Sequence, residues 1–438
     1  MFHDRKLRAA TVAADPRPPS AVSHGAGLAG LAGVCAWLLY AKLAHVDGPY
    51  AALLNLVACA APMIFWSVLI DKTHRNASTG IDWDRVRPWR ETLDTSLTKL
   101  AGLWATWAAI ALVYATARFY WTPRFVDFPF AMWCLTHAAP LLFVLSIPYV
   151  LWIDRRLAEP RDGAYALGAW LMGQGADRPA IEAHLRSWAV KGFFLAFMLA
   201  IVPGGFGDLV RRGWLDALES PVALAQLLVV FMFTVDAAFA TVGYILTLRP
   251  LDTHIRSANP YASGWTAALI CYPPFLLMQP GGPLDYHPGT ADWVHWLRDM
   301  PVAQASTGAM LVVLAAVYAW ATVAFGLRFS NLTHRGILTH GPYAWSRHPA
   351  YLSKNLFWWL STLPFLSTAN AAEAARATLL LAAVGGVYYW RAKTEERHLG
   401  EDPAYRAYDA WMTRNGPVPR FFNRLSGSAR SRPEPSEA

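Results

Sequence analysis

The sequence predicts an all-α, polytopic membrane protein, and its composition gives the first indication. Of 438 residues, 55% are hydrophobic and only 16% are charged, whereas a soluble domain is about 25% charged. The second indication is a series of apolar stretches, most of them long enough to cross the roughly 30 Å of a hydrocarbon core as helices. A helix satisfies its own backbone hydrogen bonds in lipid, so helices are the expected form of these stretches.

The apolar stretches predict about ten transmembrane helices. They cover residues 26–43, 50–70, 100–117, 129–152, 189–203, 221–247, 264–279, 305–326, 353–368 and 374–390. Between the fifth and sixth stretches, glycine recurs at residues 204–207, and we expect a turn there.

The distribution of lysine and arginine predicts the orientation. With a cytoplasmic N-terminus, ten spans place 31 of the 38 basic residues in segments on the cytoplasmic side, as the positive-inside rule requires. Both termini are then expected in the cytoplasm. Topology and contact with anionic membrane lipids account for the net charge of +8, so no nucleic-acid partner is indicated.

The chain divides into four expected regions. They are a cytoplasmic tail (1–25), an N-terminal transmembrane region of about seven spans (26–304), a C-terminal domain (305–424) and a disordered tail (425–438). The four cysteines fall in or beside apolar spans without the spacing of a metal site, so neither a metal centre nor a disulfide framework is expected. The oligomeric state is not indicated.

Two polar segments in the C-terminal domain carry the candidate chemistry. The first island, residues 338–352, holds two histidines, an arginine and two tyrosines around a Gly-Pro turn. The second island, residues 391–399, places Arg391 and Glu395 four residues apart on one helix face. The apolar segment between the islands reads as a hairpin. We therefore expect the islands to meet in one composite site, on the cytoplasmic side.

The islands resemble the C-terminal signature of the isoprenylcysteine carboxyl methyltransferase family. The matching elements are His340-Gly-Pro-Tyr343, Arg347-His-Pro-Ala-Tyr351 and Arg391-x-x-x-Glu395-Glu396, followed by Tyr405-x-x-Tyr408. The resemblance covers about the last hundred residues, with the elements in the family's order and spacing. One departure is Ser353, which stands where the family usually has glycine.

The resemblance implies an enzyme that moves a methyl group from S-adenosylmethionine (AdoMet) to a lipophilic or prenylated acceptor, with O-methylation of a carboxylate favoured. A carboxylate is already a nucleophile at neutral pH, so such a site must mainly orient the reactants and exclude water. The implied catalytic residue, which orients the acceptor, is Arg391. The implied cofactor-binding residues are Gly341, Tyr343, His348, Pro349, Tyr351 and Glu395.

Other interpretations stay open. Membrane sterol reductases, which use NADPH, also resemble this region and share the element Arg-His-Pro-x-Tyr-Leu, although Ala350 stands where they have asparagine. A scaffold or transporter would use the islands as anchors, and Arg391 and Glu395 alone could be an ordinary salt bridge. Asp236 lies inside an apolar span, where it either pairs with a polar partner or lines a substrate cavity.

Overall fold

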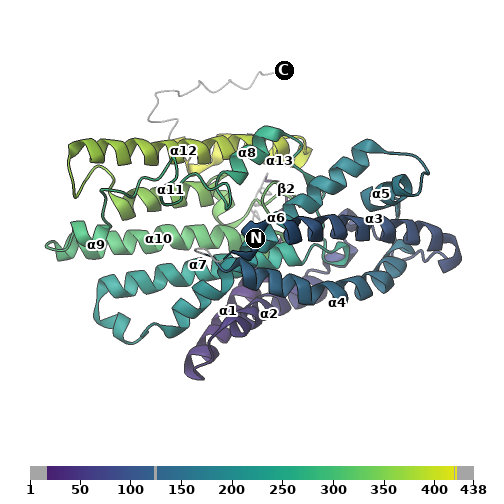
Figure 1. The fold of residues 1–438 in the computed structure, drawn as a ribbon, viewed down its shortest axis with the longest axis horizontal. Helices are drawn as coiled ribbons and strands as arrows, with labels where there is room; N and C mark the ends of the chain where they lie inside the picture. Colours follow the sequence, from purple (N-terminus) through teal and green to yellow (C-terminus); the bar gives the residue numbers. More distant parts are fainter. Residues whose placement is uncertain (1–16, 123–125, 419, 422–438) are drawn as a thin grey trace, which may run out of the picture.

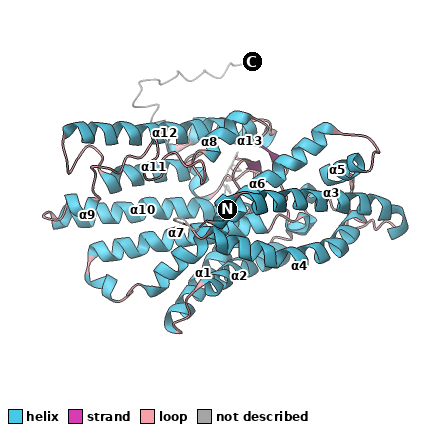
Figure 2. Cartoon of the chain, viewed as in Figure 1, coloured by secondary structure: helices cyan, strands magenta, loops and turns pink. Residues whose placement is uncertain are grey.

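The computed structural model describes residues 17–122, 126–418 and 420–421 (Figure 1). The tail expected to be disordered, 425–438, and most of the expected cytoplasmic tail lie outside the described residues. Helices make up nearly all regular structure, and one pair of short antiparallel strands, β1 (Ser257–Ala258) and β2 (Thr333–His334), joins two loops (Figure 2). The prediction of an all-α, polytopic membrane protein is confirmed.

Eight helices are long and apolar enough to cross a membrane, judged by length and composition over the described residues. They belong to α1 (His24–Leu43), α2 (Pro49–Phe65, extended to Ile70 by a π-helical turn), α3 (Trp89–Thr116), α4 (Phe128–Asp154), α6 (Arg178–Arg211), α7 (Pro221–Ile245), α10 (Pro301–Phe325) and α12 (Ala371–Leu399). The shorter helices are α5 (Gly163–Leu171), α8 (Ala262–Leu269), α9 (Trp293–Trp296), α11 (Pro349–Thr362) and α13 (Pro403–Asn415).

Two of the ten expected spans are therefore not long helices. The stretch 264–279 ends its helix, α8, at Leu269, shortly before Pro273 and Pro274, which supply no backbone N–H. The stretch 353–368 forms α11, whose 14 residues measure about 21 Å. That helix stops at Leu363, which has a φ of +48°, because Pro364 disfavours a helical conformation at the residue before it.

The segment after β1, residues 259–288, nevertheless extends along most of the length of α12. The Asn259 side chain donates to the backbone oxygen of Thr394 in α12, and Arg376, near the other end of α12, donates to the backbone oxygen of Pro288 at 2.7 Å. These two points on α12 lie about 27 Å apart at 1.5 Å per residue. Residues 259–288 thus traverse the protein with only one short helix. Hydropathy detects such a crossing, but it does not show that its backbone is largely irregular.

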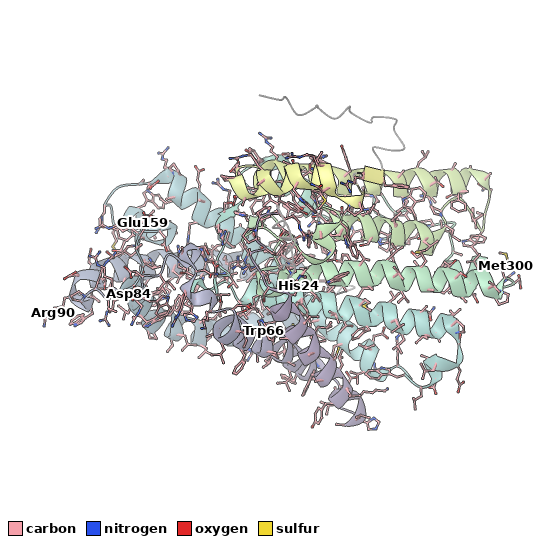
Figure 3. All side chains as sticks on the ribbon, turned by 180° about the vertical axis from the view of Figure 1, so that it is seen from behind. His24, Trp66, Asp84, Arg90, Glu159 and Met300 are labelled. Carbon is pink, nitrogen blue, oxygen red and sulfur yellow. The ribbon has the colours of Figure 1, made fainter. Side chains whose placement is uncertain are left out.

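The helices form two groups along the longest axis of the molecule. In Figure 1, α7, α10, α11 and α12 lie in a row on one side, whereas α3, α4 and α5 lie on the other. Figure 3 labels Met300, just before α10, and Arg90, at the start of α3, at opposite ends. A core of buried side chains, among them Leu38, Met63, Phe206 and Phe239, joins α1, α2, α6 and α7 between the groups.

The glycines at 204–207 do not form the expected turn, since they lie inside the continuous helix α6. Gly205 lies against α7, where the Thr234 hydroxyl donates to its backbone oxygen at 3.2 Å. A Cβ at this position would stand in ordinary contact with that hydroxyl, at 3.5 Å. Small residues at helix contacts are common in membrane bundles, so glycines in this stretch are compatible with a continuous helix.

Several loops gather beside the C-terminal ends of α7, α10 and α12. Asp252 accepts hydrogen bonds from Ser78 and from Arg328, each at 2.7 Å. The backbone of Ala21 donates to Ile337, and Tyr408 of α13 donates to the backbone of Tyr343. Both ends of the described chain therefore lie beside the first island.

Candidate functional site

The two polar islands meet, as the hairpin interpretation predicted. His348 Nε2 lies 3.1 Å from Glu396 Oε1, and the Tyr351 hydroxyl donates to the Glu395 carboxylate. The rings of His348 and Tyr351 stack with their centroids 5.6 Å apart. Residues more than forty positions apart in sequence thus share one site.

Local backbone chemistry shapes the first island. Gly341 has a φ of +58°, a conformation open to glycine at little cost, and it begins a short 3₁₀ turn, Gly341–Ala344. A Cβ at this glycine would also stand 3.3 Å from the Trp320 indole nitrogen. Pro349 then occupies the first position of α11, where the absence of an N–H does no harm. The turn and the proline place His348 and Tyr351 beside α12.

A cavity opens between the islands and the helices behind them. The room that it offers to a water-sized sphere is about 170 Å³, which is smaller than the roughly 300–1,000 Å³ of small-molecule sites. α10, α11 and α12 and the loop 326–338 supply most of its wall. Polar residues in that wall include Tyr272, Asn331, His348, Tyr351, Arg391 and Glu395.

Arg391 is the most deeply buried charge in the second island, at 2% exposure. It donates to the Asn331 side-chain oxygen at 2.5 Å and to the Tyr272 hydroxyl at 3.4 Å. Its guanidinium carbon lies 5.2 Å from the centre of the Tyr351 ring. Among the described residues its Nε has no hydrogen-bond partner, and it lies 3.6 Å from Glu395 Oε1. The predicted shared helix face of Arg391 and Glu395 is therefore confirmed, and their head groups lie close together.

The structure brings together most of the site residues that the resemblance implies. The cavity wall includes Tyr343, His348, Tyr351, Arg391 and Glu395, but neither Gly341 nor Pro349, which shape the backbone beside it. Glu396 does not line the cavity either. Its carboxylate contacts His348 and lies 2.7 Å from the Lys393 ammonium. The two adjacent glutamates thus have different surroundings, and only Glu395 faces the cavity.

Sequence reasoning missed both hydrogen-bond partners of Arg391. Tyr272 lies in a stretch expected to be an ordinary span, and Asn331 lies in a loop with no recognised motif. One available signal was Arg391 itself, because a guanidinium buried near a membrane requires polar hydrogen-bond partners. This requirement predicts that partners exist, but it does not identify them.

Three further arginines of the cavity wall are already engaged. Arg328 pairs with Asp252 at 2.7 Å. Arg335 donates to backbone oxygens that include those of Gly243 and Phe329; burial lowers the pKa of Arg335 to about 9, so it stays charged at neutral pH. Burial also opposes the charge on Arg347, but the Asp409 carboxylate that it contacts holds the pKa of Arg347 above its usual value.

Asp236 has polar partners, as the first of its two interpretations expected, and it does not line the cavity itself. The Thr322 hydroxyl donates to it, the Tyr318 hydroxyl faces it, and the Lys354 ammonium acts on it electrostatically. Asp236 itself is not part of the cavity wall, whereas Thr322, Tyr318 and Lys354 are. The carboxylate therefore lies directly behind the wall.

Residues 300–412 match the model of a family described as a protein of unknown function, DUF1295. The matched range contains both islands and the helices α10, α11 and α12. It makes this region similar to a family of membrane proteins and gives no support for the isoprenylcysteine carboxyl methyltransferase family specifically. No curated protein and no solved structure matches the chain.

Proposed function

We propose that this membrane protein is an AdoMet-dependent methyltransferase that acts on a lipophilic or prenylated acceptor, most favourably on a carboxylate oxygen. The observation that carries the proposal is the pairing of Arg391 and Glu395 at one cavity. A buried cation, whose Nε makes no hydrogen bond among the described residues, lies next to a carboxylate, and aromatic side chains lie beside them. Such a site suits one anionic and one cationic reactant side by side.

The residues present fit the groups that AdoMet would bring. Its ammonium and ribose hydroxyls need acceptors, and Glu395 retains acceptor capacity after receiving the Tyr351 hydroxyl. Its carboxylate needs a donor. His348 Nε2 donates to Glu396, so His348 Nδ1, which lies 3.9 Å from Glu395 Oε2, supplies that donor when the imidazole carries both protons. Glu395, His348, Tyr351 and Tyr343 would hold the cofactor. When bound, AdoMet supplies a methyl group that is already activated by its positively charged sulfur.

The chain's own contribution to methyl transfer is positioning. Arg391 would orient an acceptor carboxylate through its Nε, which donates no hydrogen bond to the described residues, while Asn331 and Tyr272 fix the guanidinium. A carboxylate is ionised at neutral pH, so no general base is required. The apolar residues of the wall, such as Phe325 and Leu338, would cover the acceptor's tail and exclude water, which strengthens the electrostatic interactions inside.

The cations of the cavity weigh against the NADPH-dependent alternative. A 2′-phosphate needs an available arginine or lysine, but Arg328, Arg335 and Arg347 are committed to protein partners. Lys354 also lines the cavity, but the nearby Asp236 carboxylate would oppose a phosphate there. The Glu395 carboxylate would also repel a phosphate group.

Ligand binding tests the proposal directly. Purified protein in lipid nanodiscs is titrated calorimetrically with AdoMet, its demethylated product and NADPH. We expect binding of the first two only, together with transfer of a labelled methyl group to lipids or prenylated peptides supplied in the nanodisc. Binding of NADPH alone would contradict the proposal and favour a reductase. Mass spectrometry of cells fed labelled methionine, with and without the gene, would then identify the acceptor.

A further inference from the structure

Lys354 also lines the cavity, and the proposed methyl transfer assigns it no role. Lys354 lies in α11, one turn beyond Tyr351, and its ammonium is surrounded by aromatic rings. The distances from Nζ to the ring centres are 5.4 Å for Tyr318, 5.2 Å for Trp358 and 5.6 Å for Tyr388. Cation–π contacts of this kind hold a charge in place, but they do not satisfy its N–H donors.

The Lys354 ammonium lacks hydrogen-bond acceptors. Among the described residues, no oxygen lies within hydrogen-bond distance of its Nζ, and no carboxylate lies within the 4.0 Å of an ion pair, although the lysine lines the cavity. The nearby carboxylate of Asp236 instead accepts the hydroxyl of Thr322, with the Tyr318 hydroxyl facing it. An ammonium carries three donors, so these donors are available to a ligand.

Asp236 determines what kind of ligand group fits. Its carboxylate acts electrostatically on Lys354 across the cavity wall, and buried charges in a membrane protein favour such pairing. The balanced pair does not require an anion, and a second anion placed there would be repelled by Asp236. An uncharged oxygen, such as a carbonyl or hydroxyl, would satisfy the donors without that repulsion.

The position of Lys354 relates this group to the proposed acceptor site. Both cations lie near the Tyr388 ring, with the Arg391 guanidinium carbon 5.9 Å and the Lys354 Nζ 5.6 Å from its centre, and both line the cavity. An acceptor held by Arg391 at one end would therefore have Lys354 within reach in the same cavity.

We propose that Lys354, balanced by Asp236, donates a hydrogen bond to an uncharged oxygen in the body of the acceptor. This inference rests on the proposed function, because it takes Arg391 to hold the acceptor's carboxylate. The acceptor is then a lipid acid that carries a carbonyl or hydroxyl along its chain, and a plain hydrocarbon or isoprenyl tail is the poorer ligand.

The test uses octadecanoic acid and a set of its oxo isomers, in which the carbonyl is moved along the chain. Each competes with tritiated octadecanoic acid for the full-length protein in nanodiscs. We expect one or a few adjacent isomers to bind about tenfold more tightly than the plain acid, as a hydrogen bond from a charged donor predicts. The variant Lys354→Met should lose this preference, and Lys354→Arg should restore part of it.

Two further variants separate recognition from folding. Lys191→Met is the matched control, because the Lys191 ammonium also lies over an aromatic ring, Trp188, at 3.6 Å but does not line the cavity; it should keep the preference. The double variant Asp236→Asn/Lys354→Met leaves no unpaired charge, so it should fold even if Lys354→Met does not, and it should show no preference.

Equal binding of all isomers to the wild type, or a preference that survives in the double variant, would overturn the inference. Methyl transfer from AdoMet to the plain acid would then still support the proposed function. The reverse result, oxo-selective binding that depends on Lys354 without any methyl transfer, would contradict the proposed function and retain this site.

Discussion

Arg391 donates a 2.5 Å hydrogen bond to the side-chain oxygen of Asn331, and both residues are buried, at 2% and 9% exposure. This bond ties the second island to the loop between α10 and the first island. It is the shortest hydrogen bond of the guanidinium among the described residues, because the two bonds to the Tyr272 hydroxyl measure 3.5 Å and 3.4 Å. Asn331 is thus a positioning residue for the cation that we propose to hold the acceptor.

Removal of this bond gives the first prediction. In the variant Asn331→Ala, turnover should fall about tenfold to hundredfold, because a hydrogen bond to a charged group contributes about 1.5–3 kcal/mol. AdoMet affinity should change little, since Glu395 keeps its contact with Tyr351. Single-turnover methyl transfer and calorimetry measure the two effects separately.

Asn55→Ala is the control for that experiment. Asn55 is equally buried, at 1% exposure, but it lies in α2 away from the cavity between the islands. Its replacement should not affect turnover beyond any loss of folded protein. If the Asn331 and Asn55 variants lose turnover in parallel with stability, Asn331 has no positioning role.

The meeting of the islands was accessible from sequence, but the partners of Arg391 were not. The approach of His348 to Glu396 follows from a short apolar hairpin and a helical register, both of which are local patterns. Tyr272 and Asn331 come from separate segments, and their approach depends on where α8 ends. A hydropathy pattern reports that residues 264–279 are apolar, but it does not report that Pro273 and Pro274 interrupt the helix.

The second prediction concerns the membrane orientation. Ser20, in the N-terminal segment, and Asn415, in α13, should both be cytoplasmic, because the segments around them carry much of the basic charge. Cysteines introduced singly at these positions in a cysteine-free background should react with an impermeant reagent only from the cytoplasmic side. Met300 lies at the N-terminal end of α10, away from the loops beside the first island (Figure 3). A cysteine introduced there should react only when the reagent is added on the extracytoplasmic side. Labelling of positions 20 and 415 from opposite sides would contradict the topology.

The third prediction is a loss of stability in acid. Burial lowers the pKa of His340 to about 4, with His24 and Arg17 adding to the effect; the unfolded value is about 6.5. Below about pH 6.5 the unfolded chain takes up a proton that the folded chain resists, so stability falls as the pH drops toward 4. His254 has a similarly lowered pKa and should contribute in the same direction.

Thermal unfolding in detergent micelles at pH 7.5 and pH 5 tests this dependence. His340→Asn should shrink the difference between the two midpoints without abolishing it, since His254 remains. The exposed His45 provides the control, and His45→Asn should leave the difference unchanged. A pH dependence that is the same in all three proteins would show that His340 is not responsible.

The fourth prediction concerns the pair of Asp252 and Arg328, which connects the loops beside the site. Both side chains are at most 5% exposed, and they lie 2.7 Å apart. Asp252→Ala leaves a buried charge unpaired and should cost about 3–5 kcal/mol of unfolding free energy. The exposed pair of Asp208 and Arg212 has a similar distance, 2.9 Å, so Asp208→Ala should cost at most about 1 kcal/mol. Equilibrium unfolding in mixed micelles measures both free energies. Equal losses in the two variants would show that the buried pair of Asp252 and Arg328 does not stabilise the loops more than an exposed pair does.

The last prediction separates the roles of Arg391 and Glu395. Glu395→Gln removes a charged acceptor and should weaken AdoMet binding about tenfold to hundredfold. Arg391→Ala should leave AdoMet binding nearly intact, because Tyr351 still contacts Glu395, but it should abolish most turnover, since the acceptor is no longer oriented toward the methyl group. Calorimetry and single-turnover transfer provide the measurements.

The short distance between the two residues makes this separation a demanding test. Arg391 Nε and Glu395 Oε1 are 3.6 Å apart, so each could serve only to hold the other. In that case both variants would lose the same modest stability and the same AdoMet affinity. Lys393→Ala supplies the baseline, because Lys393 lies on the same helix, pairs with Glu396 at 2.7 Å and is 49% exposed. A loss of AdoMet affinity in Glu395→Gln that clearly exceeds the loss in Arg391→Ala, measured against that baseline, would assign Glu395 to the cofactor and Arg391 to the acceptor.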